Sequence, residues 1–285
     1  MKEIFTQKKT TLSFEVFPPK KEEEFEGALD VLNQLSTLHP DFISVTYGAG
    51  GSRSKKTIDI ASYIQNTLRI PALAHITCVG NTKQDIDLVM EELQQAGLSN
   101  VLALRGDRPA YMSDEQYEAR EFSHANDLIT YLKKTTSLNI AGACYPEKHY
   151  EAATLSKDLT FLKQKVNAGA DFLITQLFFD NDLFYRFEEK VRALGITIPI
   201  CAGIMPITTA KQLGTTVSLS GSCVPKKLAD IIATYGDDAE DMRKAGIEFA
   251  VDQLNDLKAH HVNGIHIYSM NKPKTTARIV EMLHK

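Results

Sequence analysis

The stretch ALAHITCVGNTKQDIDLVMEELQQAGLSNVLALRG, residues 72–106, contains one structural unit of the chain and the start of the next. Residues 72–80 form a short apolar run bounded by turn residues, which is typical of a strand buried on both faces. The segment after it carries apolar residues at the spacing of a core-facing helix: Ile86, Val89, Met90 and Leu93. A second apolar run follows at 100–106. The segment therefore predicts a strand–helix–strand unit, which is typical of a parallel sheet.

The same alternation runs from one end of the chain to the other. The strand-like runs are residues 11–17, 42–48, 72–80, 100–106, 139–146, 171–179, 198–207 and 262–270. Eight strand–helix units in 285 residues predict a single-domain (β/α)8 TIM barrel of the α/β class over residues 1–285. A doubly wound sheet would more often use five or six such units. Residues 223–236 and 238–261 predict extra helices between strands seven and eight.

Composition narrows the class of protein. The chain has 32 Lys and Arg against 36 Asp and Glu, so no basic surface for nucleic acid is expected. No apolar run approaches the roughly 20 residues of a membrane span, and the N-terminus has no signal-peptide pattern. The four cysteines are far apart, which argues against a disulfide scaffold or a zinc site. We therefore expect a cytoplasmic protein with reduced thiols.

Polar residues end nearly every predicted strand, where a barrel of this kind carries its chemistry. The clearest case is Glu15 in SFEVFPPKK, residues 13–21, a carboxylate inside an apolar strand. Partial burial would raise the pKa of Glu15 and suit it to general acid catalysis. The alternative is a structural carboxylate satisfied by neighbouring donors. Other polar residues at strand ends are Thr46, Tyr47, His75, Thr77, Tyr145, Glu147, Tyr268 and Asn271.

Two further strand ends stand out. In LALRGDRP, residues 102–109, Arg105 and Asp107 are expected on one face, with Gly106 allowing close backbone approach. The alternative for these two side chains is a buried ion pair with each other. Gln176 is the polar side chain in LITQLFF, and a substrate with donor and acceptor edges is one candidate partner for its amide.

Several familiar motifs are missing. GAGGSRSKK, residues 48–56, lacks the spacing of a phosphate-binding loop and predicts a mobile loop after the second strand. No dinucleotide-binding fingerprint follows any strand. HHVNGIH at 260–266 and EKH at 147–149 lack metal-ligand spacing, so no metal is expected.

The motifs SFEVFPPK, ISVTYGAGG, AHITC, ALRGD, YPEKH, ITQLFFD, GIMPI and YSMN occur in this order, close to the ends of successive strands. Together they resemble methylenetetrahydrofolate reductase of the short bacterial type over essentially the whole chain. The resemblance implies a flavoprotein barrel that binds FAD and reduces methylenetetrahydrofolate to methyltetrahydrofolate with NADH or NADPH. Hydride would pass through the flavin in a ping-pong reaction that serves one-carbon metabolism and methionine supply.

The resemblance also implies roles for individual residues. Glu15 corresponds to the essential acid, Asp107 to the carboxylate beside flavin and pterin, and Gln176 to the side chain that orients folate and nicotinamide. Tyr268 and Lys272 correspond to positions at the flavin or substrate edge. The positions that line the FAD site in the family are Thr46, His75, Leu104, Arg105, Gly106, Asp107, His124, Ala125, Ala143, Tyr145, His149, Asp158, Lys165 and Ile174.

The chain departs from the family pattern at a few positions. Phe161 and Gln164 stand where an Asn and an Arg often face the FAD diphosphate, and only Lys165 keeps the positive charge. His124 replaces a common Tyr, and Thr216 replaces a ligand-stacking Phe. From the resemblance, we expect these changes to bear on FAD affinity and nicotinamide preference more than on the reaction itself.

Other functions stay open beside this one. One is another flavin barrel, such as a proline dehydrogenase, and another is a non-catalytic flavin-binding or partner-docking subunit. A third is a reductase that takes electrons from an iron–sulfur protein. The remaining expectations are small-molecule substrates, a homo-oligomer, and a chain without the regulatory domain of eukaryotic members.

Overall fold

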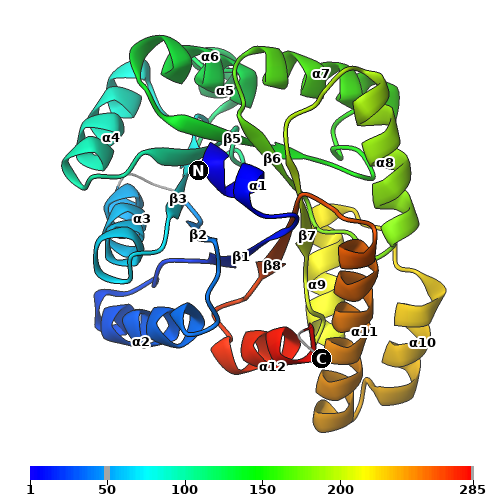
Figure 1. Ribbon diagram of the computed structural model, residues 1–285. Coiled ribbons are helices and arrows are strands. Elements are labelled where there is room, and N and C mark those ends of the chain that lie inside the picture. Colours follow the sequence, from blue (N-terminus) through cyan, green and yellow to red (C-terminus); the bar gives the residue numbers. More distant parts are fainter. Residues whose placement is uncertain (48–51, 284–285) are drawn as a thin grey trace.

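The computed structural model describes residues 1–47 and 52–283 as a barrel of strands surrounded by helices (Figure 1). The predicted glycine-rich loop falls partly on residues 48–51, which lie outside the described residues, as do 284–285.

Eight parallel strands close into a barrel in the order in which they occur along the chain. They are β1 (Thr11–Val16), β2 (Phe42–Val45), β3 (Ala72–Thr77), β4 (Asn100–Leu104), β5 (Asn139–Cys144), β6 (Phe172–Thr175), β7 (Ile200–Ile204) and β8 (Gly264–Tyr268). In the register of this sheet, Glu15 lies opposite Ser44 of β2 and Tyr268 of β8. The predicted (β/α)8 barrel is therefore confirmed.

Helices cover the outside of the barrel and one of its ends (Figure 1). They are α1 (Lys2–Gln7), α2 (Phe25–Ser36), α3 (Ser52–Ser62), α4 (Lys83–Gln95), α5 (Asp114–Glu118), α6 (Ala125–Thr135), α7 (Leu155–Asn167), α8 (Asn181–Ala193), α9 (Ala210–Ser220), α10 (Lys226–Tyr235), α11 (Ala239–Ala259) and α12 (Pro273–Leu283). Three of them, α9, α10 and α11, lie between β7 and β8. The predicted extra helices are thus confirmed.

The strands are shorter than the apolar runs that predicted them. β4 ends at Leu104, so Arg105, Gly106 and Asp107 lie in the loop that follows. Gly106 has a φ of +84°, a left-handed backbone conformation that a strand cannot contain. The prediction that Arg105 and Asp107 share one face of a strand end is therefore wrong.

The N-terminal helix α1 covers one end of the barrel (Figure 1). Its Phe5 ring lies 5.1 Å from the ring of Phe172 and 6.5 Å from that of Phe42. Both of these rings belong to the cluster that fills the barrel interior, with Leu73, Leu102, Ala141, Ile174 and Cys201. The sequence does not predict α1, because six residues show too little periodicity. Its packing leaves the opposite end of the barrel for a ligand.

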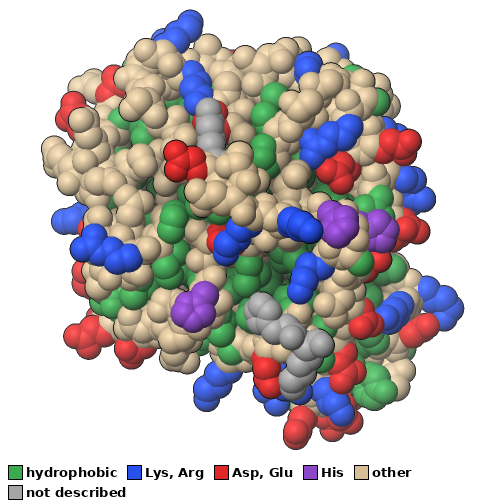
Figure 2. All heavy atoms as spheres, viewed as in Figure 1, with side chains coloured by type: hydrophobic (Ala, Val, Ile, Leu, Met, Phe, Trp, Pro, Cys, Tyr) green, Lys and Arg blue, Asp and Glu red, His purple; other side chains and the backbone are tan. Residues whose placement is uncertain are grey.

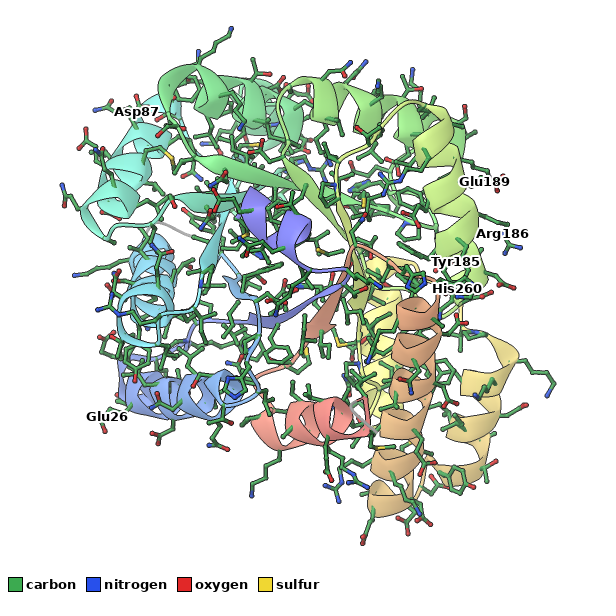
Figure 3. All side chains as sticks on the ribbon, in the orientation of Figure 1. Glu26, Asp87, Tyr185, Arg186, Glu189 and His260 are labelled. Atoms are coloured by element: carbon green, nitrogen blue, oxygen red, sulfur yellow. The ribbon has the colours of Figure 1, made fainter. Side chains whose placement is uncertain are left out.

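A polar cluster joins α8 to α11 on the outer surface. The Tyr185 hydroxyl donates to Asp256 Oδ2 over 2.7 Å and lies 3.0 Å from His260 Nδ1. Figure 3 shows Tyr185 and His260 lying toward each other on the outside of the barrel. Side chains that point outward in the same view are Glu26, Asp87, Arg186 and Glu189. This cluster therefore serves helix packing and lies away from the barrel interior.

On the face seen in Figure 2, Lys and Arg side chains are interspersed with Asp and Glu. A nucleic-acid-binding surface would instead gather its basic residues in a patch or stripe. Within residues 1–47 and 52–283, no helix has both the length and the apolarity needed to cross a membrane.

Gly246 allows α11 to pack closely on the loop after β7. A Cβ at this position would lie 1.7 Å from the Ile207 carbonyl oxygen, so Gly246→Ala forces the helix outward. We expect this substitution to lower the free energy of unfolding by about 1–3 kcal/mol, measured by urea denaturation. The matched control is Gly27→Ala in α2, where nothing lies within 4 Å of the new Cβ. Because Ala is the better helix former, Gly27→Ala should be neutral or stabilising by up to about 1 kcal/mol. A urea midpoint of unfolding for Gly246→Ala that equals or exceeds the wild-type midpoint would contradict this account.

Candidate functional site

A cavity of about 450 Å³ opens at the C-terminal end of the strands. Its walls contain most of the predicted site residues: Glu15, Thr46, His75, Leu104, Arg105, Gly106, Asp107, Ala143, Tyr145, His149, Ile174, Gln176 and Tyr268. They come from β1 to β6 and from β8, or from the loops just after these strands. The cavity volume is typical of small-molecule sites. The expectation that polar strand ends converge at one mouth is thus met.

Five predicted residues lie outside the lining of this cavity. The backbone N–H of His124 donates to Asp127 at the start of α6, where Ala125 is the first helical residue. Lys272 lies after β8, with its ammonium 3.4 Å from the Thr208 hydroxyl. The other two, Asp158 and Lys165 on α7, lie outside the cavity and contact residues that line it.

The α7 side chains contact residues that do line the cavity. Asp158 Oδ2 accepts a hydrogen bond from the backbone N–H of His149 over 3.0 Å. Lys165 donates to the Ala143 carbonyl and lies with its ammonium 5.9 Å from the centre of the Tyr145 ring. These contacts fix the β5 side of the mouth.

Three of the departures from the family pattern lie on the outside of α7 and on α9, and the fourth, His124, lies at the start of α6. Phe161 and Gln164 are both exposed, and the Lys157 ammonium lies 5.3 Å from the Phe161 ring centre. Thr216 of α9 is buried. None of these three side chains lines the cavity.

Two other polar residues expected at the mouth hold loops together. Glu147 Oε2 accepts from the backbone N–H of Cys223 over 2.8 Å, which ties the α9–α10 loop to the loop after β5. The Asn271 side chain bonds both the N–H and the carbonyl of Phe17. Two residues earlier, the Ser269 hydroxyl donates to the Glu15 carbonyl over 2.6 Å. The segment after β8 therefore fixes the backbone that carries Glu15.

The Glu15 carboxylate is approached by three polar side chains from three other strands. Its Oε2 atom lies 3.5 Å from the Ser44 hydroxyl, 3.6 Å from His75 Nε2 and 3.7 Å from His266 Nε2. The side chain keeps 19% of its surface exposed, toward the cavity. Glu15 is thus a cavity residue and is also held by neighbours, so the two roles weighed for it are compatible.

The pKa of Glu15 differs from the sequence expectation. Burial by itself raises it, but the nearby His266 and His75 side chains and the Ser44 hydroxyl together outweigh burial and lower the pKa of Glu15 below its ordinary value of 4.5. The predicted raised pKa is therefore wrong. Burial also lowers the pKa of His75 to about 4, despite the opposing effect of Glu15, so this imidazole is neutral at pH 7.

Gly106 makes the cavity wall tight next to β3. A Cβ at this position would lie 2.8 Å from Thr77 Cβ and 3.0 Å from a Val79 methyl group. With its left-handed φ, this backbone therefore excludes other side chains, and the polypeptide itself forms the surface of the cavity here.

Arg105 pairs with Glu151 from the loop after β5, through two nitrogen–oxygen contacts, one of them 2.9 Å. The alternative of a buried Arg105–Asp107 ion pair is therefore wrong, and Asp107 stays exposed at the mouth. The cause is the turn at Gly106, which separates the two side chains. The hydrogen bonds and charge of Arg105 lower the pKa of Glu151 to about 2, although burial opposes this.

The Arg105–Glu151 pair predicts a pH dependence. Because the pKa of Glu151 is lowered from 4.5 to about 2, the pair stabilises the fold above pH 4.5 and loses this effect as the pH falls toward 2. We expect the difference in thermal unfolding midpoint between wild type and Glu151→Gln to shrink over this interval. Glu151 is 46% exposed, so the difference itself should be small and sensitive to salt. A difference that stays constant across the interval would contradict the assignment.

Several lining residues were not predicted from the sequence. They are Val79, Gly80, Asn81, Pro109 and Tyr111. They belong to the loops after β3 and β4, which have no periodic pattern. The same holds for the buried partners of Glu15, since Ser44 and His266 are ordinary residues within apolar strands. Only a knowledge of which strands are neighbours could have identified them.

Comparison with known proteins gives a consistent result. A sequence profile of methylenetetrahydrofolate reductase matches residues 1–284. The chain is 35% identical to methylenetetrahydrofolate reductase (NADH) 1 of Arabidopsis thaliana over 294 residues, covering 98% of this chain and 49% of that protein. It is 32% identical to 5,10-methylenetetrahydrofolate reductase of Escherichia coli strain K12 over 277 residues, covering 97% and 92%. The chain spans about half the length of the plant relatives it matches.

The fold is also shared with more distant proteins. A solved structure of a protein from Clostridium thermocellum that binds two copies of 5-methyl-5,6,7,8-tetrahydrofolic acid superposes with a TM-score of 0.66. It covers 99% of this chain and 96% of its own, at 14% identity, which is a likeness of fold alone. The match over residues 1–284 and the identity to the bacterial relative place this chain in the methylenetetrahydrofolate reductase family.

Proposed function

We propose that this protein reduces methylenetetrahydrofolate to methyltetrahydrofolate with a bound FAD, and that a nicotinamide donor and the folate occupy the barrel mouth in turn. The observation that carries the proposal is the position of Glu15, whose carboxylate borders a cavity lined by the other predicted site residues. The match to reductases of the same family supports the reaction class.

The residues present are compatible with FAD. His75 Nε2 is a buried polar atom without a hydrogen-bond partner, and it lies beside the cavity. A buried polar atom of this kind is costly unless a ligand satisfies it. The bare backbone at Gly106 would let a planar ring approach closely, and Lys165 supplies a positive charge behind the wall. When bound, FAD would supply a two-electron carrier between nicotinamide and folate.

Glu15 is proposed as the general acid. Its free oxygen would give a proton to a folate nitrogen, which opens the methylene bridge and leaves a cationic iminium carbon as hydride acceptor. The neighbouring His266, His75 and Ser44 side chains lower the pKa of Glu15. Bound folate would exclude water from the mouth and thereby strengthen the desolvation that raises this pKa. The acid would thus become protonated when its substrate is in place.

Asp107 and Gln176 are proposed to act on the same substrate. Asp107 lines the mouth as an exposed carboxylate, and a negative charge there would stabilise the cationic iminium. Gln176 Oε1 accepts from the backbone N–H of Leu177 over 3.1 Å, which fixes the amide plane against the cavity. Tyr268 is also fixed, because its hydroxyl donates to the Thr175 carbonyl over 2.7 Å. Rigid groups of this kind orient a ligand without further ordering.

Anaerobic spectroscopy tests the first half of the reaction. Purified protein would be saturated with FAD, and the absorbance band near ~450 nm followed after addition of NADH, NADPH or dithionite. Bleaching by NADH or NADPH is expected and identifies the donor. If dithionite reduces the flavin but neither nicotinamide does, the electron donor would be a protein instead of a nicotinamide. A protein that cannot bind FAD would contradict the proposal. The homo-oligomer and the cytoplasmic location stay predictions. Light scattering, which measures the molar mass in solution, tests the first of them.

A further inference from the structure

A fully buried histidine lies beneath the cavity and has no part in the chemistry proposed so far. His266 of β8 has none of its surface exposed, and the same is true of Ser13 and Ser44 on the neighbouring strands β1 and β2. In the sheet register, Ser13 lies opposite His266, and Ser44 lies opposite Glu15. These polar groups form a layer inside the barrel that begins below the cavity and ends at the Glu15 carboxylate.

The ring orientation of His266 is determined by Ser13. The Ser13 hydroxyl lies 3.1 Å from the Ile265 carbonyl oxygen and 2.8 Å from His266 Nδ1. Donation from this hydroxyl to Nδ1 places the imidazole proton on Nε2, which can then donate toward Ser44 and Glu15. The Phe42 ring stacks on the imidazole at 5.9 Å and 17°. With Nδ1 and one ring face occupied, the Nε2 atom is directed toward Ser44 at 3.4 Å and toward Glu15 at 3.7 Å.

The contacts of the Glu15 carboxylate with the described side chains converge on one oxygen. Ser44, His75 and His266 all approach Oε2, and no described residue makes a hydrogen bond or ion pair with Oε1. Since part of the side chain is exposed to the cavity, Oε1 is the oxygen that can meet a ligand. The carboxylate is therefore held from below by one oxygen and presented through the other.

We propose that His266 is a positioning residue for Glu15, which it holds through Oε2, directly and through the Ser44 hydroxyl, so that Oε1 faces the substrate. This inference rests on the proposed function, because it assigns to Glu15 the role of acid toward folate. It adds an interior residue that touches neither substrate nor cofactor.

The groups facing Glu15 predict the direction of a pH effect. They are Ser44 from β2, His75 from β3, and His266 and Tyr268 from β8. His75 has a pKa of about 4, and burial raises the pKa of Tyr268 well above 10, so both are neutral at pH 7. The nearby His266 side chain lowers the pKa of Glu15, as His75 and Ser44 also do, whereas burial raises it. Removal of His266 should therefore raise the pKa of Glu15.

The test compares His266→Asn with a matched His261→Asn control. Asn at position 266 keeps an amide near Ser13 but cannot reach Ser44 and Glu15. His261 is exposed between α11 and β8, and its φ of 55° suits Asn. Two rates are measured on the FAD-loaded enzyme as a function of pH: the rate at which nicotinamide reduces the flavin, and the rate at which folate reoxidises it. A third measurement, without substrate, is the ¹³C titration of the Glu15 carboxyl group, assigned by its loss in Glu15→Gln.

In His266→Asn we expect the folate half-reaction to slow about tenfold or more, because the acid is misplaced. Its pH profile and the Glu15 titration should both move to higher pH, while the nicotinamide half-reaction and the control stay at wild-type values. Should His266→Asn not fold, Ser44→Ala, a nearly isosteric change, is expected to give smaller shifts in the same direction.

The proposal is overturned if the Glu15 titration is unmoved in both variants, or if both half-reactions fall together. A slower folate half-reaction with an unmoved titration would make His266 a packing residue only. Failure of the proposed function is distinguishable, because the wild-type enzyme would then lack the folate half-reaction. The carboxyl titration still decides the role of His266 in that case.

Discussion

Replacing Glu15 by Gln is expected to slow the folate half-reaction by about 10²–10⁴-fold, the usual contribution of a positioned general acid. Gln has nearly the same shape, and its amide can still meet Ser44 and His266, so the cavity should keep its form. It has no proton to give to the folate nitrogen. Reduction of the bound flavin by nicotinamide needs no acid at this position and should stay within about twofold of wild type.

The control for this substitution is Glu26→Gln, the same change on an outward-pointing side chain of α2 (Figure 3). It should leave both half-reactions unchanged. Rapid-mixing absorbance measures the two rates separately. If Glu15→Gln slowed both half-reactions equally, Glu15 would be a structural carboxylate, which is the alternative considered from its sequence.

The second large effect is expected for Asp107→Asn. Asp107 is exposed at the mouth, and its charge would stabilise a cation that develops only during the reaction. Loss of such a group is expected to lower the rate of the folate half-reaction by about 10²-fold, with little change in folate affinity. Because the carboxylate is in contact with water, added salt should reduce the difference in folate half-reaction rate between the wild type and Asp107→Asn.

Stopped-flow measurements at low and at high ionic strength test this prediction, with Asp87→Asn as control. Asp87 lies on the outside of α4 and accepts from the Tyr131 hydroxyl, which an amide oxygen can also do (Figure 3). A variant that loses folate affinity while its limiting rate stays at the wild-type value would assign Asp107 to binding instead of stabilisation of the iminium.

The fold could be predicted because its determinants are local. Apolar runs and helical stripes lie within short segments such as 72–106, and eight of them in a row allow few arrangements. α1 was missed because its six residues matter through Phe5, which packs on rings from β2 and β6. Strand ends were overestimated where a glycine such as Gly106 ends the strand by its backbone conformation.

The candidate site could be predicted only in part. Strand-end residues such as Glu15 and Gln176 were found because a parallel barrel brings all its strand ends to one mouth. Their partners were not found, since His266 lies about 250 positions from Glu15 along the chain and beside it in the barrel. The lowered pKa of Glu15 and the Arg105–Glu151 pair both arise from contacts of this kind. Sequence therefore identified the groups, and tertiary structure determined their charges and pairing.

The most direct test of the proposed reaction uses the reduced, FAD-loaded protein under anaerobic conditions. It is mixed with methylenetetrahydrofolate while the flavin band near ~450 nm is followed and the folate product is identified by chromatography. Return of the band, with one methyltetrahydrofolate formed for each flavin oxidised, is the predicted result. A band that stays bleached with methylenetetrahydrofolate but returns with another oxidant would contradict the assignment of folate as the substrate.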